Sequence, residues 1–507
     1  MKLNRKQLGL LLLAILLIGS SWLGIVTARA GLTVRTLHGA ELSRLQEDVP
    51  LLYLAPQQAK AVPGVLIAHG FAGSKQLMLG YGHVLAHAGY AVMLWDFDGH
   101  GANPARLQRY ELQQNLDVAL QALLAQPEVD PERLALLGHS MGSGIVMTAG
   151  IRNPERFAAT VAVSPTGATT TPNVPRNLQL QAGSGEGRFV SNAQRLLAQA
   201  GGENSNLAEG LGRELIVIPG VEHITILFSD GSHQAARRWL NATFGSADDS
   251  QSADLTGQRY RDRRMGWYGL HLLGWLVGLA AVGLGAPAAI APLDSESATP
   301  AAKIAPVQRW VGLVIAPMVA VAGLVLLSQK MDLQALGGVQ VGGAVGVWFL
   351  IAGLTWLAVL ARLPRPTLVA VGLGIGLFGW LWVAFGAMAQ VVWLQWWLIP
   401  IRLRLWLPLA IACLPWFLAS GIVQQNIGVG KRILWWLGQS LSLIGGFVLT
   451  LNFLPQLGFM FLLLPLFPPL LGILSLVAGL LNRAWVYAIG SALFFGWLLA
   501  AGFPLSA

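Results

Sequence analysis

The sequence predicts a two-part chain: an α/β domain with a mostly parallel sheet and helices on both faces, followed by an all-α transmembrane bundle. Strand-like and helix-like segments alternate between residues 31 and 250, which is typical of βαβ units. Long apolar runs then fill residues 266–507 and are long enough to span a bilayer. Only 11% of the 507 residues are charged, whereas soluble proteins carry roughly 25%, so much of the chain must lie in lipid.

Residues 1–30 have the layout of a secretory signal. Three cations, Lys2, Arg5 and Lys6, precede the apolar run Leu8–Val26, and Ala28-Arg29-Ala30 then fits an A-x-A cleavage site. The apolar run is also long enough to cross a membrane. A cleaved signal peptide and an uncleaved signal anchor therefore both fit, and both send the next domain across the membrane.

The strands and helices of the domain at residues 31–250 can be predicted in chain order. We expect edge strands within 32–56, further strands at 64–68, 90–95, 134–137, 159–163, 178–181 and 214–218, and helices at 76–89 and 109–126. In an open sheet of this kind, functional residues lie at the carboxyl ends of the strands.

The strand at 134–137 runs into Gly138-His139-Ser140-Met141-Gly142, which fits the G-x-S-x-G nucleophile elbow. A serine at the tip of a tight strand-to-helix turn has a strained backbone, and its neighbours lie too close for side chains. Glycine at positions 138 and 142 removes that clash, and the residues that follow are compatible with a helix. The motif predicts Ser140 as a nucleophile, and the alternative is a glycine-rich turn without chemistry.

Four motifs in this order resemble the α/β-hydrolase family, and the resemblance covers about residues 32–245. They are HGFAGS at 69–74, DFDGHG at 96–101, VDPERLALLGHSMG at 129–142 and PGVEH at 219–223. They are similar to the dienelactone-hydrolase-like, acyl-esterase and serine-aminopeptidase-like branches, and they do not select a substrate. The resemblance implies a catalytic triad in the chain order Ser, acid, His.

Three histidines follow Ser140 and could serve as the base. His223 comes after a strand and a Pro-Gly turn, which matches the family's position for the base. His233 is predicted on the surface of the last helix, and His271 lies in an apolar run. We therefore expect His223 to be the base and His233→Ala to be nearly neutral.

We expect the acid to be a glutamate, because no aspartate lies between Ser140 and His223. Glu186 follows the strand at 178–181, where the family usually carries Asp, and a longer carboxylate can still accept the imidazole N–H. Glu222 adjoins His223, but adjacent residues seldom point the right way. The other candidates are Glu155, Glu203, Glu209 and Glu214.

The resemblance also implies an oxyanion hole made of the backbone N–H groups of Phe71 and Met141. Asp96, Asp98 and His100 match the family's D-x-x-G-H-G turn, so we assign them to the scaffold rather than to the chemistry. The single cysteine, Cys413, allows neither an intrachain disulfide nor a cysteine-based metal site. We expect no metal and no cofactor.

Residues 251–265 are predicted to form a linker that ends in a basic collar, and about eight membrane helices follow in 266–507. The collar arginines are Arg259, Arg261, Arg263 and Arg264. The apolar runs lie near 266–290, 309–328, 338–361, 367–391, 405–424, 433–454, 456–481 and 484–504. No acidic residue follows Asp332, and the polar groups of the spans are His271, Gln390, Gln424, Gln439 and Asn452. The spans therefore lack the carboxylates that coupled transport usually requires, and membrane anchoring is the leading hypothesis for their role.

Loop charges predict that the soluble domain lies outside the cell membrane, because cytoplasmic loops are rich in Lys and Arg. With that orientation the inner side holds Lys2, Arg5, Lys6, Lys303, Arg309, Arg362, Arg365, Lys431, Arg432 and Arg483. The outer side holds Lys330, Arg402 and Arg404, together with the collar, which is the exception to the rule.

These observations predict a membrane-bound serine hydrolase that acts on an ester, thioester or amide. The alternatives are an acyltransferase, with a lipid or lipid-linked substrate presented by the bundle, and a transporter or scaffold with a non-catalytic hydrolase domain. The expected partners are membrane lipids and a small-molecule, lipid or peptide acyl substrate. Basic residues do not cluster with aromatic ones in the soluble part, so we expect no nucleic acid. The sequence specifies no oligomeric state.

Overall fold

The structure is a computed structural model that describes residues 4–39, 48–108, 111–245, 259–283 and 306–506. The chain forms two compact units. We call Ser21–Gly269 together with Ala389–Trp397 the sheet unit. We call Met1–Ser20, Leu270–Met388 and Leu398–Ala507 the helical unit. Four features predicted from the sequence lie outside the described residues: the cations Lys2 and Lys303, the linker residues 251–258 and the helix start at Arg109.

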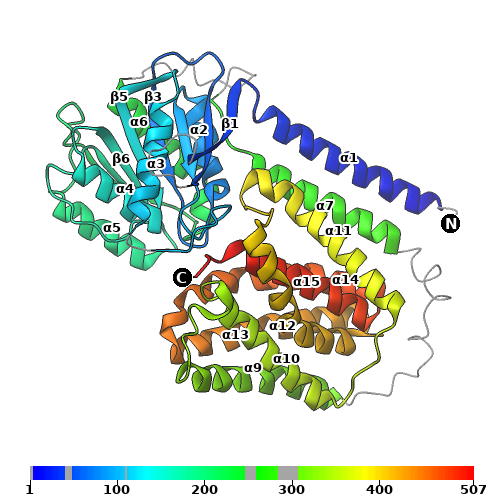
Figure 1. Cartoon of the computed structure of the whole chain (residues 1–507). Coiled ribbons are helices and arrows are strands. Elements are labelled where there is room, and N and C mark those ends of the chain that lie inside the picture. The colour runs from blue at the N-terminus through cyan, green and yellow to red at the C-terminus, as the bar shows by residue number, and fades with distance from the viewer. Residues whose placement is uncertain (1–3, 40–47, 109–110, 246–258, 284–305, 507) are drawn as a thin grey trace. The chain divides into compact units, whose positions relative to one another are not determined.

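One eight-stranded sheet organises the sheet unit (Figure 1). The strands lie in the order β1-β2-β4-β3-β5-β6-β7-β8, and every pair from β4 to β8 is parallel. Only β2 runs antiparallel to its neighbours β1 and β4. The strands are β1 (Leu32–His38), β2 (Pro50–Pro56), β3 (Val62–Ala68), β4 (Ala91–Trp95), β5 (Val129–His139), β6 (Phe157–Val163), β7 (Leu178–Gly183) and β8 (Arg213–Ile218).

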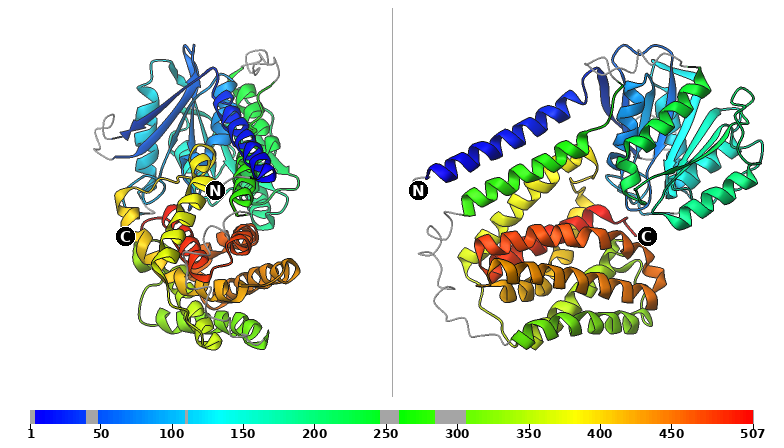
Figure 2. Two further views of the ribbon diagram at one scale, coloured as in Figure 1. Left: turned by 90° about the vertical axis from the view of Figure 1, so that its right-hand side faces the viewer. Right: turned by 180° about the vertical axis from the view of Figure 1, so that it is seen from behind.

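Helices cover both faces of this sheet (Figure 2), as the sequence predicts. Side chains alternate along β3: Val65 and Ile67 pack with α2 (Leu79–His87) and α6 (Asp230–Phe244) on one face. Leu66 and Ala68 pack with α3 (Leu112–Leu124) and α4 (Met141–Arg152) on the other. Helix α5 (Gly187–Gln199) packs on β7, next to α4.

One strand prediction is wrong. Residues 32–56 were expected to form edge strands, but β2 is an interior strand between β1 and β4. The reason is a crossover: the chain turns back after β1, and β4 then pairs with the open side of β2 through Leu51–Leu54. Of these two strands only β1 lies at an edge of the sheet, and its residues range from buried to exposed, as suits an edge.

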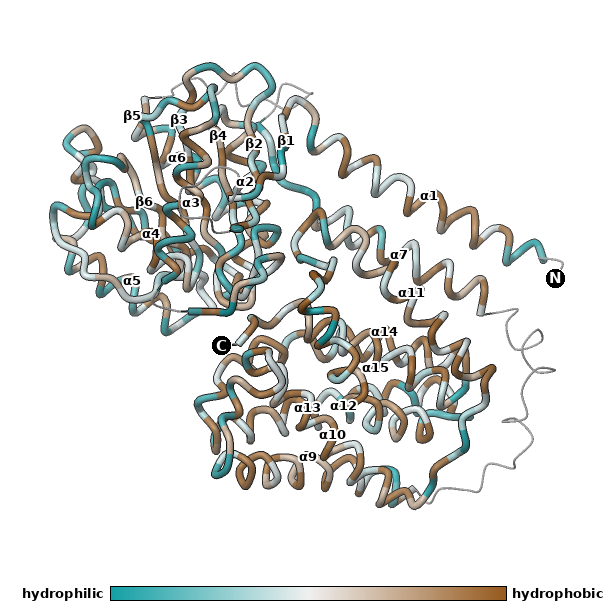
Figure 3. Tube along the Cα trace, viewed as in Figure 1, coloured by the Kyte–Doolittle hydropathy of each residue, from teal (hydrophilic) through white to brown (hydrophobic). Residues whose placement is uncertain are grey.

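Nine helices among the described residues are long and apolar enough to cross a membrane. Figure 3 shows hydrophobic residues along most of their length. None of the nine contains Asp or Glu. They are α1 (Arg5–Thr27), α7 (Arg264–Gly283), α9 (Pro306–Ser328), α10 (Gly342–Leu360), α11 (Leu368–Val392), α12 (Pro400–Gln424), α13 (Val429–Phe453), the continuous pair η7 (Pro455–Leu466) and α14 (Phe467–Leu481), and α15 (Ala484–Gly502).

Helices α1 and α7 contact each other in both units and run antiparallel. In the sheet unit, Gly24 of α1 lies directly against the ring of Trp267, so that a Cβ at this position would overlap the indole. In the helical unit, a Cβ at Gly274 of α7 would lie 3.1 Å from Leu17 Cβ. Near the other ends of the two helices, the Gln7 Nε2 amide donates to the Ala281 carbonyl oxygen at 3.4 Å. Small residues at such crossings let helix backbones approach closely.

Candidate active site

Ser140 lies at the tip of the turn from β5 into α4, with φ 52° and ψ −119°. A positive φ is unfavourable for a residue with a side chain and persists only where the surroundings enforce it. Here the Ser140 N–H donates to the Val163 carbonyl oxygen at 2.9 Å, and the Ser140 carbonyl oxygen accepts from the hydroxyls of Ser143 and Thr166. The backbone on both sides of the serine is therefore fixed.

The two glycines of the elbow are required by close approaches. A Cβ on Gly138 would overlap the Gly142 carbonyl group, one turn further along the chain. A Cβ on Gly142 would lie 2.5 Å from the carbonyl oxygen of His69, at the end of β3. Either side chain would force the serine away from the sheet.

His223 and Glu186 complete a line of contacts that begins at Ser140. The Ser140 hydroxyl lies 3.1 Å from His223 Nε2, and His223 Nδ1 lies 3.1 Å from Glu186 Oε2. A carboxylate can only accept, so Nδ1 carries the proton and Nε2 is left to accept from the serine. The Phe189 ring stacks on the His223 imidazole at 4.3 Å between centroids, and it restricts the tilt of that ring.

Glu186 is held on its other side by two donors. Its Oε1 atom accepts from the Ser164 hydroxyl at 2.8 Å and from the Gly183 N–H at 3.0 Å. Its side chain is only 1% exposed, so water does not compete for these positions. Glutamate has one more methylene group than the family's usual aspartate. These two donors fix the position of its carboxylate despite the longer side chain.

The loop that carries Phe71 lies directly beside the serine. A Cβ on Gly70 would be 3.1 Å from Ser140 Cβ, which places this turn against the elbow. His69 fixes the turn, because its Nδ1–H donates to the Gly70 carbonyl oxygen and its Nε2 accepts the Phe97 N–H. Burial lowers the pKa of His69 to about 4, so the ring is neutral near pH 7 and keeps this pattern. Met141 is the first residue of α4, on the other side of Ser140.

Two residues at the site were not singled out from the sequence. His139 Nε2–H donates to the His223 carbonyl oxygen at 3.0 Å and so supports the histidine loop from the elbow itself. Ser164 is the donor to Glu186, and it has φ 47° immediately after β6. A signal for Ser164 existed, because a polar residue directly follows a buried strand at the edge where the other site residues lie.

The structure keeps several other candidates away from the serine. Glu222 accepts from the N–H groups of Ile224 and Thr225, so it shapes its own loop rather than meeting an imidazole. Asp96 is buried, accepts from the N–H groups of Lys75 and Ala102, and pairs with the Lys75 ammonium. It therefore belongs to the scaffold that supports the loop at 69–78.

The prediction that His233 lies on the surface is wrong. His233 is 2% exposed, its Nε2–H donates to the Leu227 carbonyl oxygen at 2.8 Å, and its ring meets Tyr81 edge-on. The cause is the packing of α6 against α2, where Gly80 leaves room for the imidazole. An alanine at this position would leave a cavity and an unpaired carbonyl oxygen, so we expect His233→Ala to lower stability, while its near-neutral effect on activity stays a prediction.

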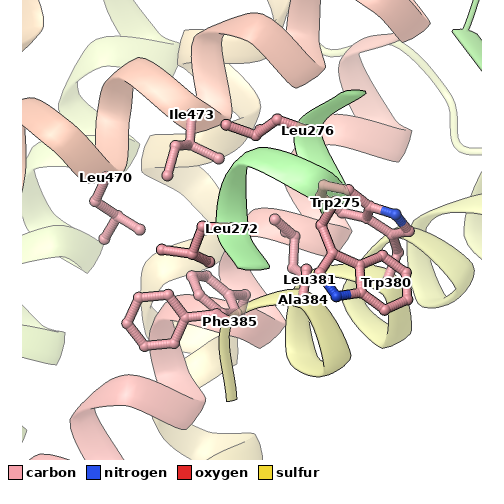
Figure 4. A pocket seen from close by; sticks show the side chains of 10 residues that line it. Leu272, Trp275, Leu276, Trp380, Leu381, Ala384, Phe385, Leu470 and Ile473 are labelled. Atoms are coloured by element: carbon pink, nitrogen blue, oxygen red, sulfur yellow. The ribbon is translucent and has the colours of Figure 1, made fainter. Parts of the chain in front are cut away.

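Within the described part of the chain, the His, Cys, Asp and Glu side chains form no group of three that could hold a metal ion. A small pocket lies within the helical unit between α7, α11, α14 and α15 (Figure 4). Only aliphatic and aromatic side chains line it, among them Leu272, Trp275, Trp380 and Phe385. It offers no acid, base or nucleophile.

Comparisons with known proteins identify a matching family model and two relatives. Residues 58–209 match the model of the family described as serine aminopeptidase, S33. The uncharacterized proteins Rv2307c and MT2364 of Mycobacterium tuberculosis, from strains H37Rv and CDC 1551, are each 30% identical over 200 residues. The match spans 36% of this chain and 70% of each relative.

Solved structures that are similar to part of this chain include two hydrolases. The dienelactone hydrolase from Anabaena variabilis is 19% identical, with a TM-score of 0.33, over 43% of this chain and 98% of that one. The thermostable carboxylesterase EstE1 from a metagenomic library is 15% identical, with a TM-score of 0.35, over 46% of this chain and 95% of that one.

Proposed function

The chain belongs to the α/β-hydrolase family, and from this premise we propose that it is a membrane-bound serine hydrolase that cleaves an ester, thioester or amide. The observation that carries the proposal is the line of contacts from Glu186 through His223 to Ser140, with 3.1 Å at each step. The positive φ of Ser140 supports it as well, since strained residues cluster at active sites.

The proposed reaction follows from the donors and acceptors at the site. Ser140 Oγ attacks the substrate carbonyl carbon while His223 Nε2 takes the hydroxyl proton, and the Glu186 carboxylate stabilises the imidazolium that forms. The N–H groups of Phe71 and Met141 stabilise the negative oxygen of the tetrahedral intermediate. The imidazolium then gives its proton to the leaving group, and an acyl-serine remains. Water, activated by the neutral His223, releases the acid and restores Ser140.

We propose that the sheet unit lies outside the cell membrane. Four apolar helices, α7, α9, α10 and α11, separate the end of the sheet from residues 393–397, which cluster with the sheet unit again. If each of these helices crosses the membrane once, four crossings return the chain to the side of the membrane from which it started. The described loops on the opposite side then hold more cations than the loops between spans on the sheet unit's side, as the positive-inside rule requires. Of the collar, Arg264 forms a buried ion pair with Asp262 at 2.7 Å.

Ester hydrolysis by the purified full-length protein tests the proposed activity. In detergent micelles we expect steady release of p-nitrophenol from p-nitrophenyl butyrate, and a loss of at least 1,000-fold in kcat for Ser140→Ala, in line with roughly 10⁶-fold losses for nucleophile removal in a related triad. Ser191→Ala serves as the matched control, since its exposed hydroxyl donates only to the Gly187 carbonyl oxygen within α5. Wild-type activity in Ser140→Ala would contradict the proposal.

A further inference from the structure

A short segment between two apolar helices packs on the loop that carries Phe71. The segment is Ala389–Trp397, which comprises the last turn of α11 and most of the connection to α12, and it belongs to the same compact unit as Ser21–Gly269. Gln395 makes the central contact: its Oε1 atom accepts from Gln76 Nε2 at 2.6 Å, and its backbone N–H donates to the Ser74 hydroxyl at 3.3 Å. These two partners directly follow the glycine-rich turn 70–73.

The segment is itself rigidly built. Gln390 Oε1 accepts from the N–H groups of Trp396 and Trp397, and Gln390 Nε2 donates to Gln395 Oε1 at 3.3 Å. Gln395 Nε2 donates to the Trp397 carbonyl oxygen at 2.9 Å. Gln395 is only 7% exposed and Gln76 only 5%. Buried amide contacts of this kind are costly to leave unpaired, so they hold their partners in one geometry.

The loop at 69–78 therefore has supports on two sides. On one side Asp96 holds Lys75 through both its backbone N–H and its ammonium group. On the other, Gln395 holds Ser74 and Gln76, the residues on either side of Lys75. The turn that precedes them is tight, with a Gly73 N–H to Gly70 carbonyl bond of 3.1 Å and φ 57° at Ala72. A shift at residues 74–76 would thus move the amide of Phe71.

We propose that Gln395 is a positioning residue for the oxyanion hole, so that the segment joining two membrane helices sets the activity of the hydrolase. The inference rests on the proposed function of Ser140 and the Phe71 amide. An oxyanion donor must lie at hydrogen-bond distance, roughly 3 Å, from the developing negative charge, and a displacement of about 1 Å from that position can cost on the order of 100-fold in rate. A support supplied by the α11–α12 segment makes full activity depend on the presence of the membrane helices.

The test is the rate at which a fluorophosphonate probe modifies Ser140 in the full-length protein, measured together with kcat and KM for p-nitrophenyl butyrate. For Gln395→Ala we expect labelling and kcat to fall on the order of 10-fold while KM changes little, because the displaced donor stabilises the transition state more than the bound substrate. Gln424→Ala is the matched control: it removes a similarly buried glutamine at the end of α12, whose Nε2 amide donates to the Ser420 hydroxyl. It should label at the wild-type rate.

A double-mutant cycle separates positioning from general destabilisation. Gln76→Ala and Gln395→Ala remove two ends of one contact, so the double variant should be no slower than the slower single variant. If Gln395→Ala does not give folded protein, Gln395→Met replaces it, because methionine keeps the side-chain volume without the amide. The same fall in labelling and kcat is expected for this variant. Wild-type labelling in the Gln395 variant, or losses that multiply in the double variant, overturns the inference. A wild-type protein that is not labelled at Ser140 overturns the proposed function instead.

Discussion

Both oxygens of the Glu186 carboxylate are committed. Oε2 faces His223, and Oε1 accepts from Ser164 and from the Gly183 N–H. An amide in its place cannot satisfy all three contacts. If the amide nitrogen faces His223 Nδ1–H, two donors meet, and if it is turned around, the nitrogen meets the Gly183 donor.

For Glu186→Gln we therefore expect a folded protein whose kcat falls by roughly 10³–10⁴, as for the loss of a triad carboxylate elsewhere. Glu186→Asp should retain more activity, because the charge remains although the side chain is shorter. His223→Ala should be at least as damaging as Glu186→Gln, and the double variant should be no worse than the His223 variant, since triad members act as a unit. Steady-state kinetics of the purified variants checks this order. Equal activity of Glu186→Gln and wild type would show that another group orients the imidazole.

His233 gives a prediction about stability rather than catalysis. His233→Ala opens a cavity between α6 and α2 and leaves the Leu227 carbonyl oxygen without its donor. Together these changes should lower the free energy of unfolding by about 2–4 kcal/mol. Thermal unfolding of the full-length protein measures this, with His38→Ala as control, because His38 is exposed on β1. A melting temperature equal to that of the control would mean that α6 does not pack as described.

At the scale of elements, α1 is tied to both units. The Ala28 carbonyl oxygen, just after α1, accepts from His83 Nδ1 and from His87 Nε2, each at 3.1 Å. The chain then turns directly into β1, with the Leu32 N–H donating to the Arg29 carbonyl oxygen. The predicted cleavage site at Ala28–Ala30 is thus part of a folded turn. A protease would need this segment to be extended.

We expect α1 to remain attached as a membrane-spanning helix. An epitope placed before Met1 should be found on the full-length band of the mature membrane protein. A second epitope after Ala507 serves as the reference for total protein. Loss of the N-terminal epitope from the mature band, with the C-terminal one retained, would mean that the signal is cleaved and that α7 loses its partner.

The sequence predicts best those features that are signalled within a few residues. Ser140, Glu186 and His223 each follow a strand of the parallel sheet within a few residues, and parallel strands bring such ends to one edge. Gln395 could not be found in this way, because its partner Gln76 is 319 residues away and no local pattern marks either glutamine. The burial of His233 depends on which face of α6 packs against α2. The interior position of β2, which was predicted to be an edge strand, depends on a crossover between strands. Both are decided by tertiary packing.

For the molecule as a whole, the side of the membrane on which the sheet unit lies can be tested with single cysteines. Cys413 is the only cysteine and is buried, so it can be replaced by Ala to give a background free of thiols. Single cysteines at the exposed positions Glu203 and Lys431 then report on the sheet unit and on the first turn of α13. With a membrane-impermeant maleimide on intact cells, we expect Glu203→Cys to react and Lys431→Cys to react only after permeabilisation. The reverse pattern would place the sheet unit in the cytoplasm.

The central claim is that Ser140 is the nucleophile of a working hydrolase. The most direct measurement is mass spectrometry of the full-length protein after treatment with a fluorophosphonate probe. The account predicts a single adduct, mapped to the peptide that contains Ser140, and no adduct in Ser140→Ala under the same conditions. An adduct that persists in Ser140→Ala, or one that maps to another residue of the wild type, would contradict it.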